Sequence, residues 1–302
     1  MEKIGVIGLG NIAQKAYLPV MATLQDKYEW HLTTRNKAKG EMLEKKYGFK
    51  HFHQTLTELI EEKPLAVFVH TPTQTHFEII KQLLENEINV YVDKPVSEDL
   101  SEVKELYKLA SEKNLILTCG FNRRFAPFNQ ALKQIGDKRT IVSEKIRENA
   151  VQPAKFAIFD LMIHSVDTAV YLMDEKIKDI NNFLVTNDGN LEQGYITLTG
   201  EKSQAQIITN MIGGSNLELT TVQGNQTRQV VTDLGRLETY QTGVITQTSC
   251  PDWENTLVTR GFDPIIKAFL RAVSTNAENP VSPESAILSH ELCFNLANSL
   301  QN

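Results

Sequence analysis

The sequence predicts an α/β fold in two parts: a doubly wound parallel sheet, then an α+β domain with a large, mostly antiparallel sheet. Over the first 120 residues, short apolar runs alternate with helical patterns, the order expected of parallel strands joined by helical crossovers. From about residue 179 to 249, runs rich in Thr, Val, Ile and Gln follow one another without a helix between them. Strands connected in this way pair mainly antiparallel.

Five strands and five helices are expected in the first part. The strands are residues 3–8, 29–34, 65–70, 89–92 and 115–119, and the helices are 11–24, 37–47, 55–62, 74–86 and 98–113. Ser97 and Ser101, close to three acidic residues, give the last of these helices an N-cap-like start. The pattern changes after Gly120, so the expected domains are residues 1–121 and 122–302.

The second part begins with a short helix near 127–135, a strand near 140–147 and a helix that contains "DLMIHSVD", residues 160–167. The long series of strands follows. Two helices, at 262–275 and 283–300, close the chain, and prolines punctuate the gap between them.

Composition excludes several classes of function. The 302 residues carry a formal net charge of −6, without a basic stripe, which disfavours binding to nucleic acid or to an anionic membrane. No apolar run approaches the ~20 residues of a membrane-spanning helix, and the N-terminus lacks the apolar segment of a signal peptide. The 3 cysteines are far apart and outside any CxxC pattern, which suits a reducing cytosol. We therefore expect a cytoplasmic protein with no nucleic-acid or membrane partner.

The stretch "GVIGLGNIA" contains Gly8-x-Gly10-x-x-Ala13 directly after the first strand. Gly8 would make the tight turn, Gly10 would let a pyrophosphate approach the backbone, and the small Ala13 would let helix and strand pack closely. Unpaired N–H groups at the helix N-terminus attract phosphates. We predict a Rossmann dinucleotide-binding domain; the alternative is a turn that needs glycine for its shape alone. The residues expected to contact the cofactor here are Gly8, Leu9, Gly10, Asn11 and Ile12.

The end of the second strand bears on the choice of cofactor. NAD-binding domains usually place an acidic residue there to bind the ribose 2′-hydroxyl. This sequence reads "LTTRNK", with Thr34 and Arg35 and no acid. A hydroxyl beside a guanidinium suits a 2′-phosphate, so we favour NADP over NAD. The alternative is that Arg35 is a solvated surface residue.

Three ionisable residues interrupt the apolar segment "DLMIHSVD". At about 100° per residue, Asp160, His164 and Asp167 fall within roughly 60° of one another on a helix. The rest of the circumference is mostly apolar, so we expect a buried helix with one narrow ionisable strip. A structural ion-pair network or a metal site on this helix face are the alternatives. No other His or Cys cluster supports a metal, and His31, His51, His53 and His290 have no convincing context, so we predict no metal.

Four further stretches occur in order after the glycine turn: "HTPTQTH" (70–76), "DKP" (93–95), "GFNRRFAP" (120–127) and "DLMIHSVD". Together with the turn they resemble the Gfo/Idh/MocA family of oxidoreductases, and within it most closely the MviM (virulence factor) branch. The resemblance covers essentially the whole chain. It implies a dinucleotide-binding domain and a sheet-based C-terminal domain.

The resemblance also implies catalytic roles. Lys94 matches the lysine of the family's Glu-Lys-Pro motif, which lies beside the nicotinamide and the substrate. Asp160 and His164 match an Asp-x-x-x-His pair whose histidine acts as acid and base. Asp167 matches a recurrent acid that supports rather than reacts. The glycine-rich stretch that commonly precedes this pair is replaced by "QPAKFAIF", which alters the pocket wall.

Other matches concern binding. Thr71, Pro72 and His76 match a loop that lies along the cofactor, and Asp93 replaces the usual Glu near the cofactor ribose. In "GFNRRFAP", we expect Asn122 to contact substrate together with Lys94, Asp160 and His164. Arg124 is expected at the cofactor. For Arg123 and Arg124, contact with cofactor phosphate or substrate stands beside a role at the domain interface as the alternative.

The resemblance thus implies an NAD(P)-dependent dehydrogenase or reductase acting on a sugar, a cyclitol or a related small polyol or carbonyl compound. The alternatives are a non-catalytic dinucleotide- or sugar-sensing regulator on the same fold, and redox-neutral bond cleavage with a retained cofactor. The expected partners are the small-molecule substrate and a second copy of the chain, in a homodimer or homotetramer formed through the C-terminal sheet.

Overall fold

A computed structural model describes residues 1–150 and 152–301. The chain divides into two structural units. The first unit comprises Met1–Gly120 and Phe262–Ile287, and the second comprises Phe121–Gly261 and the chain from Leu288 onward. The expected division into residues 1–121 and 122–302 has nearly the same first boundary, but it does not separate Phe262–Ile287, which packs on the first unit. The assignment of cofactor and substrate binding to the two parts stays a prediction.

The first unit contains a six-stranded sheet in the order β3-β2-β1-β4-β5-β6, with every pair parallel. This is the doubly wound order predicted from the sequence. The bounds are β1 Glu2–Ile7, β2 Tyr28–Thr33, β3 His51–His53, β4 Ala66–Val69, β5 Asn89–Val92 and β6 Leu117–Cys119. Sequence analysis missed β3, because three residues are too few to show an alternating pattern.

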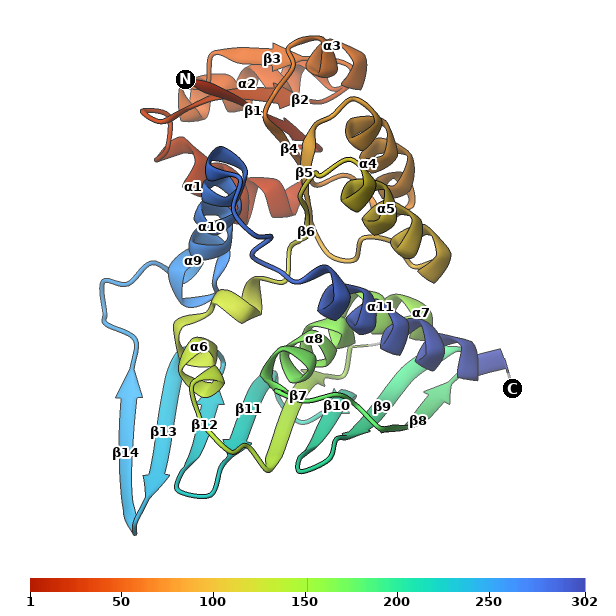
Figure 1. The fold of residues 1–302 in the computed structure, drawn as a ribbon, viewed down its shortest axis with the longest axis vertical. Coiled ribbons are helices and arrows are strands. Elements are labelled where there is room, and N and C mark those ends of the chain that lie inside the picture. The colour runs from red at the N-terminus through yellow and green to blue at the C-terminus, as the bar shows by residue number, and fades with distance from the viewer. Residues whose placement is uncertain (151, 302) are drawn as a thin grey trace. The chain divides into compact units, whose positions relative to one another are not determined.

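Helices cover both faces of this sheet. Figure 1 shows α4 and α5 on one side and α1 and α10 on the other. The rings of Phe68 and Tyr91, on β4 and β5, pack against Phe269 of α10, with centroids 5.2 and 5.5 Å apart. These contacts explain why α10 belongs to the first unit. The bounds are η1 (π-helical) Ala13–Tyr17, α1 Leu18–Ala22, α2 Lys37–Tyr47, α3 Leu56–Glu61, η2 Thr73–Thr75, α4 His76–Glu85, α5 Leu100–Glu112 and α10 Phe262–Thr275.

The second unit is built on an eight-stranded sheet in the order β14-β13-β12-β11-β7-β10-β9-β8. Only β7 and β10 pair in parallel among the described strands of this sheet, so the prediction of a mostly antiparallel sheet is confirmed. The bounds are β7 Thr140–Glu148, β8 Asp179–Asn187, β9 Asn190–Thr199, β10 Gln204–Gly213, β11 Leu217–Gln223, β12 Arg228–Thr232, β13 Arg236–Gln241 and β14 Val244–Ser249.

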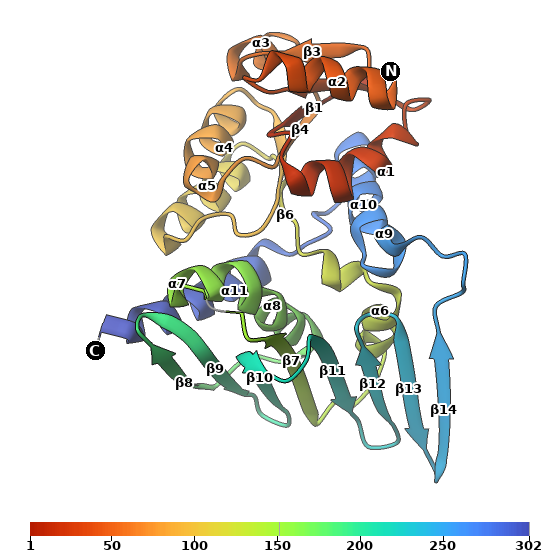
Figure 2. The ribbon, with the colours of Figure 1, turned by 180° about the vertical axis from the view of Figure 1, so that it is seen from behind.

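One continuous helical segment, α7–η4–α8, lies over the middle strands of this sheet (Figure 2). Its α8 part packs on β7 and β10, and its α7 part packs on β9. The bounds of the remaining helices are η3 Asn122–Phe125, α6 Pro127–Lys133, α7 Ala154–Ala157, η4 (π-helical) Ile158–Met162, α8 Ile163–Leu172, α9 Thr256–Thr259, α11 Pro283–Asn298 and η5 Ser299–Gln301. Within the described ranges, no helix combines the length and the apolar character needed to cross a membrane.

Candidate active site

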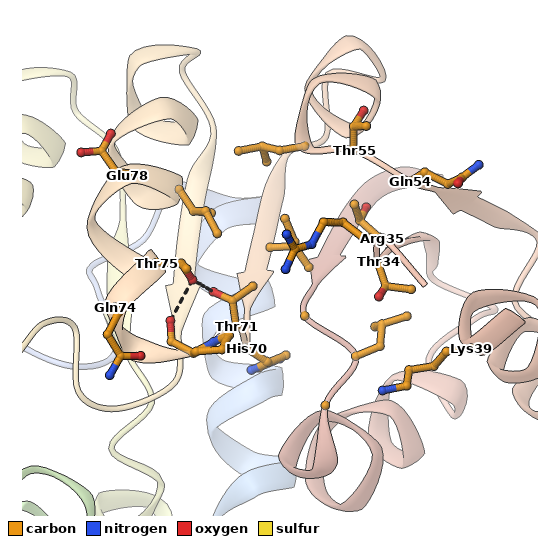
Figure 3. A pocket seen from close by; sticks show the side chains of 18 residues that line it. Thr34, Arg35, Lys39, Gln54, Thr55, His70, Thr71, Gln74, Thr75 and Glu78 are labelled. Atoms are coloured by element: carbon orange, nitrogen blue, oxygen red, sulfur yellow. Dashed lines mark hydrogen bonds between the residues drawn. The ribbon is translucent and has the colours of Figure 1, made fainter. Parts of the chain in front are cut away.

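A pocket of about 680 Å³ lies at the carboxyl ends of the strands in the first unit (Figure 3). Residues that follow four different strands line it: 8–10 after β1, 34–35 after β2, 54–55 after β3 and 70–72 after β4. The order of the strands reverses between β1 and β4, and doubly wound sheets bind ligands at that point. The volume falls in the range of pockets that hold small molecules.

The glycine turn has the geometry that the sequence predicts. Gly8 has a φ of +91°, and a Cβ there would lie 2.5 Å from the carbonyl carbon of His70, so only glycine fits. A Cβ on Gly10 would meet nothing within 4 Å, so a ligand has access to the backbone at that residue. Ala13 is fully buried. Leu9 lines the pocket together with the two glycines, whereas Asn11 and Ile12 do not.

His70 supplies a polar group that suits a bound nucleotide. Burial lowers the pKa of its imidazole to about 3, so the ring is neutral. Its ring lies 3.9 Å from that of Tyr17, centroid to centroid, and it lines the pocket. Among the residues that the structure describes, neither ring nitrogen has a hydrogen-bond partner. A buried polar group of this kind needs a ligand or water to satisfy it. His70, the open backbone at Gly10 and the pocket volume therefore fit a dinucleotide.

The end of β2 presents two cations to the pocket. Thr34 and Arg35 line it as expected, and Lys39 of α2 joins them from the same side (Figure 3). Asn36 caps α2 by accepting a hydrogen bond from the backbone N–H of Lys39, 3.0 Å away, and so fixes the start of that helix. Sequence analysis missed Lys39. Its position one turn after the Asn36 cap is the signal that places it near the end of β2.

The loop after β4 contains the expected Thr71, Pro72 and His76. Thr71 and Pro72 line the pocket, and Thr71 accepts a hydrogen bond from Thr75 at 2.9 Å (Figure 3). His76 is buried instead, with Nε2 2.8 Å from the carbonyl oxygen of Thr71 and Nδ1 2.9 Å from that of Pro95. The ring therefore ties the loop after β4 to the loop after β5, and it acts on the pocket through Thr71.

Asp93 and Lys94 follow β5 directly. The hydroxyl of Tyr17 donates a hydrogen bond to Asp93 at 3.0 Å, and it lies 3.2 Å from the hydroxyl of Tyr91. Burial raises the pKa of the Asp93 carboxyl, while Lys94 and Tyr17 act in the opposite direction. Tyr17 thus holds the side chain of Asp93 in place. Lys94 follows the carboxyl end of β5, the edge of the sheet at which the pocket lies, but neither Asp93 nor Lys94 is among the residues that line the pocket.

In the second unit, the predicted ionisable strip is present on η4 and α8. From residue 157 to 172, only Asp160, His164 and Tyr171 keep partial exposure, and Asp167 is buried. Asp160 lies in the π-helical turn η4, which the regular α-helical spacing used in the sequence analysis does not anticipate. The strip therefore contains the three predicted residues. The π-helical turn, however, changes the angle about the helix axis between Asp160 and His164 from its α-helical value.

A buried charge cluster faces His164. Nη1 of Arg123 lies 3.3 Å from Nε2 of His164, and Arg123 also donates to both carboxylate oxygens of Glu218, at 2.7 and 3.1 Å. Lys145 donates a further hydrogen bond to Glu218. A guanidinium only donates hydrogen bonds, so Nε2 is the accepting nitrogen of His164 in this contact. The contact occupies the lone pair of Nε2, so this nitrogen can take up a proton only after Arg123 releases it.

The pKa values of the cluster follow from burial and charge. Burial lowers the pKa of Lys145 to about 8, although Glu218 opposes the shift. Burial would raise the pKa of Glu218, but Arg123 and Lys145 outweigh it and hold that pKa at about 2. Sequence analysis did not select Lys145 or Glu218. The available signal is the alternating pattern of β7, "TIVSEKIRE", in which Lys145 takes a position on the face of buried Ile141.

Two other residues of "GFNRRFAP" have contacts inside the second unit. Arg124 is buried and donates to Asp167 at 2.9 and 2.5 Å, and Asp167 also accepts from Ser289 at 3.0 Å. The amide of Asn122 donates to the carbonyl oxygen of Arg260 at 2.7 Å. These contacts do not support the cofactor contact expected of Arg124 or the substrate contact expected of Asn122, and both stay predictions.

Comparison with known proteins agrees with this geometry. A family described as "Oxidoreductase family, NAD-binding Rossmann fold" matches residues 2–121. The chain is 31% identical over 300 residues to YceM of Salmonella typhimurium, named as an oxidoreductase, with 96% of this chain and 95% of that protein covered. It is 28% identical over 190 residues to myo-inositol 2-dehydrogenase of Thermotoga maritima, covering 59% of this chain and 57% of that protein.

A solved structure extends the match to both sheets. The crystal structure of a dehydrogenase (MviM) from Clostridium difficile superposes with a TM-score of 0.93 and 32% sequence identity, over 99% of each chain. The similarity thus extends over both units of the chain. On these grounds the chain belongs to the Gfo/Idh/MocA family of oxidoreductases.

Proposed function

We propose that the protein is an NAD(P)-dependent dehydrogenase or reductase that transfers a hydride between the nicotinamide and a sugar, cyclitol or related small polyol or carbonyl compound. The observation that carries the proposal is the pocket of the first unit, where Gly8, Gly10 and the unsatisfied imidazole of His70 meet at the reversal of strand order. A bound nicotinamide cofactor supplies the chemistry of hydride transfer.

The chain itself has to move a proton. Oxidation of an alcohol carbon requires a base for the hydroxyl proton, and we assign this role to Nε2 of His164. Arg123, held by two hydrogen bonds to Glu218, lies 3.3 Å from that nitrogen, so the proposal requires Nε2 to exchange Arg123 for the substrate hydroxyl. Asp160, a member of the same strip, orients a substrate hydroxyl in this proposal.

Lys94 has the complementary role. Its ammonium group would donate a hydrogen bond to the oxygen of the reacting carbon and stabilise negative charge as it develops there. The position at the carboxyl end of β5 supports this role, because ligands of open α/β sheets lie at that edge. Neighbouring Asp93 is held by Tyr17, which limits the freedom of the loop that carries Lys94.

We propose NADP as the preferred cofactor. Thr34, Arg35 and Lys39 lie together at the end of β2, where an NAD-specific domain would carry an acid. Two cations and a hydroxyl offer a 2′-phosphate several charge-assisted hydrogen bonds. The absence of an acid after β2 in the described pocket wall removes the group that would repel that phosphate.

The substrate class rests on chemistry and on a relative. A carboxylate, an imidazole and an ammonium group suit a ligand rich in hydroxyl groups, because all three form hydrogen bonds with hydroxyls. The relative from Thermotoga maritima is named for its action on myo-inositol, a cyclic polyol. We therefore propose that the substrate is a small polyol and not an apolar alcohol.

A panel assay tests the proposal. Sugars, cyclitols and the corresponding carbonyl compounds are incubated with NADP or NAD, or with the reduced cofactors, and absorbance of the reduced cofactor is followed. We expect turnover with at least one polyol or its ketone, and faster turnover with the NADP pair. Tight dinucleotide binding without turnover of any compound would favour the regulator alternative instead.

A further inference from the structure

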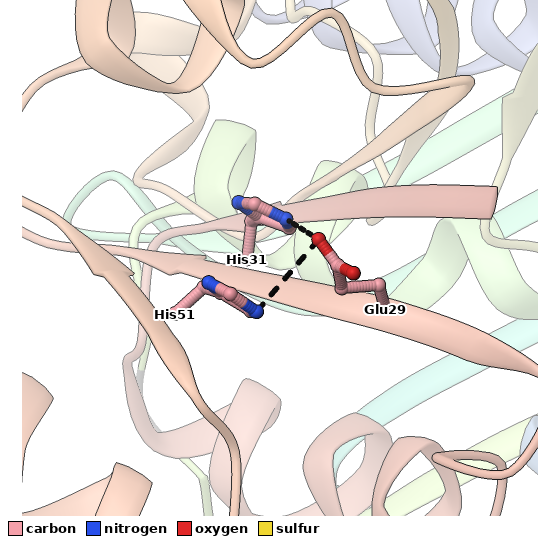
Figure 4. A group of neighbouring side chains, drawn as sticks. All are labelled: Glu29, His31 and His51. Atoms are coloured by element: carbon pink, nitrogen blue, oxygen red, sulfur yellow. Dashed lines mark hydrogen bonds and ion pairs between the residues drawn. The ribbon is translucent and has the colours of Figure 1, made fainter. Parts of the chain in front are cut away.

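We propose that Glu29, His31 and His51 form a binding site for a divalent transition-metal ion of the zinc type, at the edge of the first sheet (Figure 4). The parallel register of β2 and β3 places His31 opposite His51. Glu29 precedes His31 by two residues on β2 and therefore points to the same face. The site is separate from the nucleotide pocket, since none of the three residues lines that pocket.

The distances suit a tetrahedral ion. Oε1 of Glu29 lies 2.9 Å from Nε2 of His31 and 3.7 Å from Nε2 of His51. Metal–ligand bonds of about 2.0–2.1 Å separate tetrahedral ligand atoms by about 3.3 Å, a value between the two measured distances. The carboxylate oxygen thus lies near a nitrogen of each histidine, and the remaining adjustment is a turn of one imidazole ring.

The donor set selects the class of metal. Two imidazole nitrogens and one carboxylate oxygen are typical ligands of Zn²⁺, and three protein ligands leave a fourth position for water. Mg²⁺ and Ca²⁺ prefer oxygen ligands, so they should bind weakly here.

The other ring nitrogen of His31, Nδ1, has a hydrogen-bond partner. Nδ1 lies 2.9 Å from Nε2 of His53, so a ring that binds the metal through Nε2 can donate its remaining N–H to His53. Such outer contacts hold the ring of a ligating histidine in place. His31 is almost fully buried, which further restricts its ring.

A second triplet, His31, His53 and Glu62, also has its ligand atoms within 4.8 Å of one another. We favour the triplet with Glu29, because Glu62 already accepts a hydrogen bond from Lys3 at 2.7 Å. That hydrogen bond occupies the Glu62 carboxylate, whereas Lys3 acts on Glu29 only through its charge. The triplets differ in their second histidine, so they make different predictions for His51 and His53.

Binding requires one rearrangement. The rings of His31 and His51 are stacked, with centroids 4.5 Å apart and planes 10° apart. A metal lies near the plane of each imidazole that binds it, so the two rings cannot stay parallel. His51 is on the edge strand with 41% of its side chain exposed, and it is therefore the ring that rotates.

Metal titration tests the site. The full-length protein is stripped with a chelator, and Zn²⁺ is titrated by calorimetry, with Mg²⁺ as the comparison ion. We expect one Zn²⁺ per chain, a higher melting temperature with Zn²⁺, and no comparable effect of Mg²⁺. Co²⁺ should give the intense visible bands of a tetrahedral site. Absence of Zn²⁺ binding, or Co²⁺ bands typical of six-coordinate surface binding, would overturn the proposal.

Variants identify the ligands. Glu29→Gln and His51→Gln should each weaken Zn²⁺ binding at least tenfold, whereas Glu41→Gln, on exposed α2, should bind as the wild type does. Circular dichroism checks that each variant is folded, and His51 is exposed enough for its replacement to leave the core intact. Full binding by His51→Gln together with loss in His53→Gln would assign the ion to the other triplet and contradict ours. None of these readouts depends on the proposed enzymatic reaction.

Discussion

Single side chains explain most of the chemistry that we assign to the protein. His164 is one of the few partly exposed groups on an otherwise buried helix, and its Nε2 accepts from Arg123. Arg35 lies at the position where dinucleotide-binding domains discriminate between the two cofactors. The two residues therefore allow separate tests of proton transfer and of cofactor choice.

Replacement of His164 by Asn should lower turnover at least about a hundredfold, the usual contribution of a general acid or base. Asparagine keeps a polar group near Arg123 but cannot accept the substrate proton. The affinity for the dinucleotide, measured by calorimetry or fluorescence, should change by less than about twofold, because the cofactor pocket is unaltered. Loss of the folded state in this variant would instead support the structural ion-pair alternative.

Arg35→Ala should weaken NADP binding about tenfold or more while leaving NAD nearly unaffected, because we propose that the guanidinium binds the 2′-phosphate, which NAD lacks. Dissociation constants for both cofactors measure this directly. Lys37→Ala is the matched control, since Lys37 is an exposed cation two residues along that does not line the pocket. Equal weakening of NADP and NAD in Arg35→Ala would contradict the 2′-phosphate assignment.

At the scale of secondary-structure elements, ion pairs connect two strands of the second sheet with the helical turn η3, next to His164. Glu218 of β11 binds Arg123 of η3 and Lys145 of β7, and all three are buried or nearly so. Removal of one member of a buried ion network costs more than its formation contributes, because the remaining charges are left unpaired.

Glu218→Gln should therefore destabilise the protein by about 3 kcal/mol at pH 7. The pKa of Glu218 is about 2 in the folded protein against an ordinary 4.5, so the ionised carboxylate stabilises the fold fully above pH 4.5. That stabilisation is lost as the pH falls from 4.5 toward 2, and the difference between variant and wild type should shrink over this range. Denaturant unfolding measured at several pH values checks this, with exposed Glu148→Gln as the control. A difference that is independent of pH would contradict it.

The secondary-structure elements also show how much of the fold can be predicted from the sequence. The longer strands and helices of the first unit follow from apolar periodicity, and the helix at 262–275 has the predicted bounds. Strand β3 and the π-helical turn η4 were missed, because one is too short for a pattern and the other depends on tertiary packing. Missing β3 had a consequence: His51 and His53 seemed isolated, although the sheet brings them next to His31.

The residues of the candidate site also fall into those that the sequence predicts and those that it does not. Residues that adjoin the strand ends, such as Gly8 and Arg35, are predictable because parallel strands end at one edge of the sheet. Lys145 and Glu218 come from distant strands, and only the pairing of β7 with β11 brings them together. Local sequence carries no information about that pairing.

At the scale of the whole molecule, we propose that the second sheet mediates self-association. Its two outermost strands expose large apolar side chains: Phe183 on β8 is 61% exposed and Ile245 on β14 is 64% exposed. Exposed apolar side chains on sheet edges are typical of contact surfaces. We expect a dimer or tetramer by light scattering.

The double variant Phe183→Glu, Ile245→Glu should shift the measured mass toward the monomer, because charges on an apolar interface oppose its burial. Met42→Glu, on α2 in the first unit, is the control and should leave the mass unchanged. A monomeric wild type would contradict the proposal.

The central claim, net hydride transfer to the cofactor, has a direct test. A polyol that is turned over in the panel is prepared with deuterium on its reacting carbon and incubated with NADP, and the nicotinamide is then analysed by NMR. We predict deuterium on one face of the C4 carbon of the reduced cofactor, in an amount equal to the ketone formed. Product that forms without any labelled, reduced cofactor in solution would contradict the claim and indicate redox-neutral chemistry.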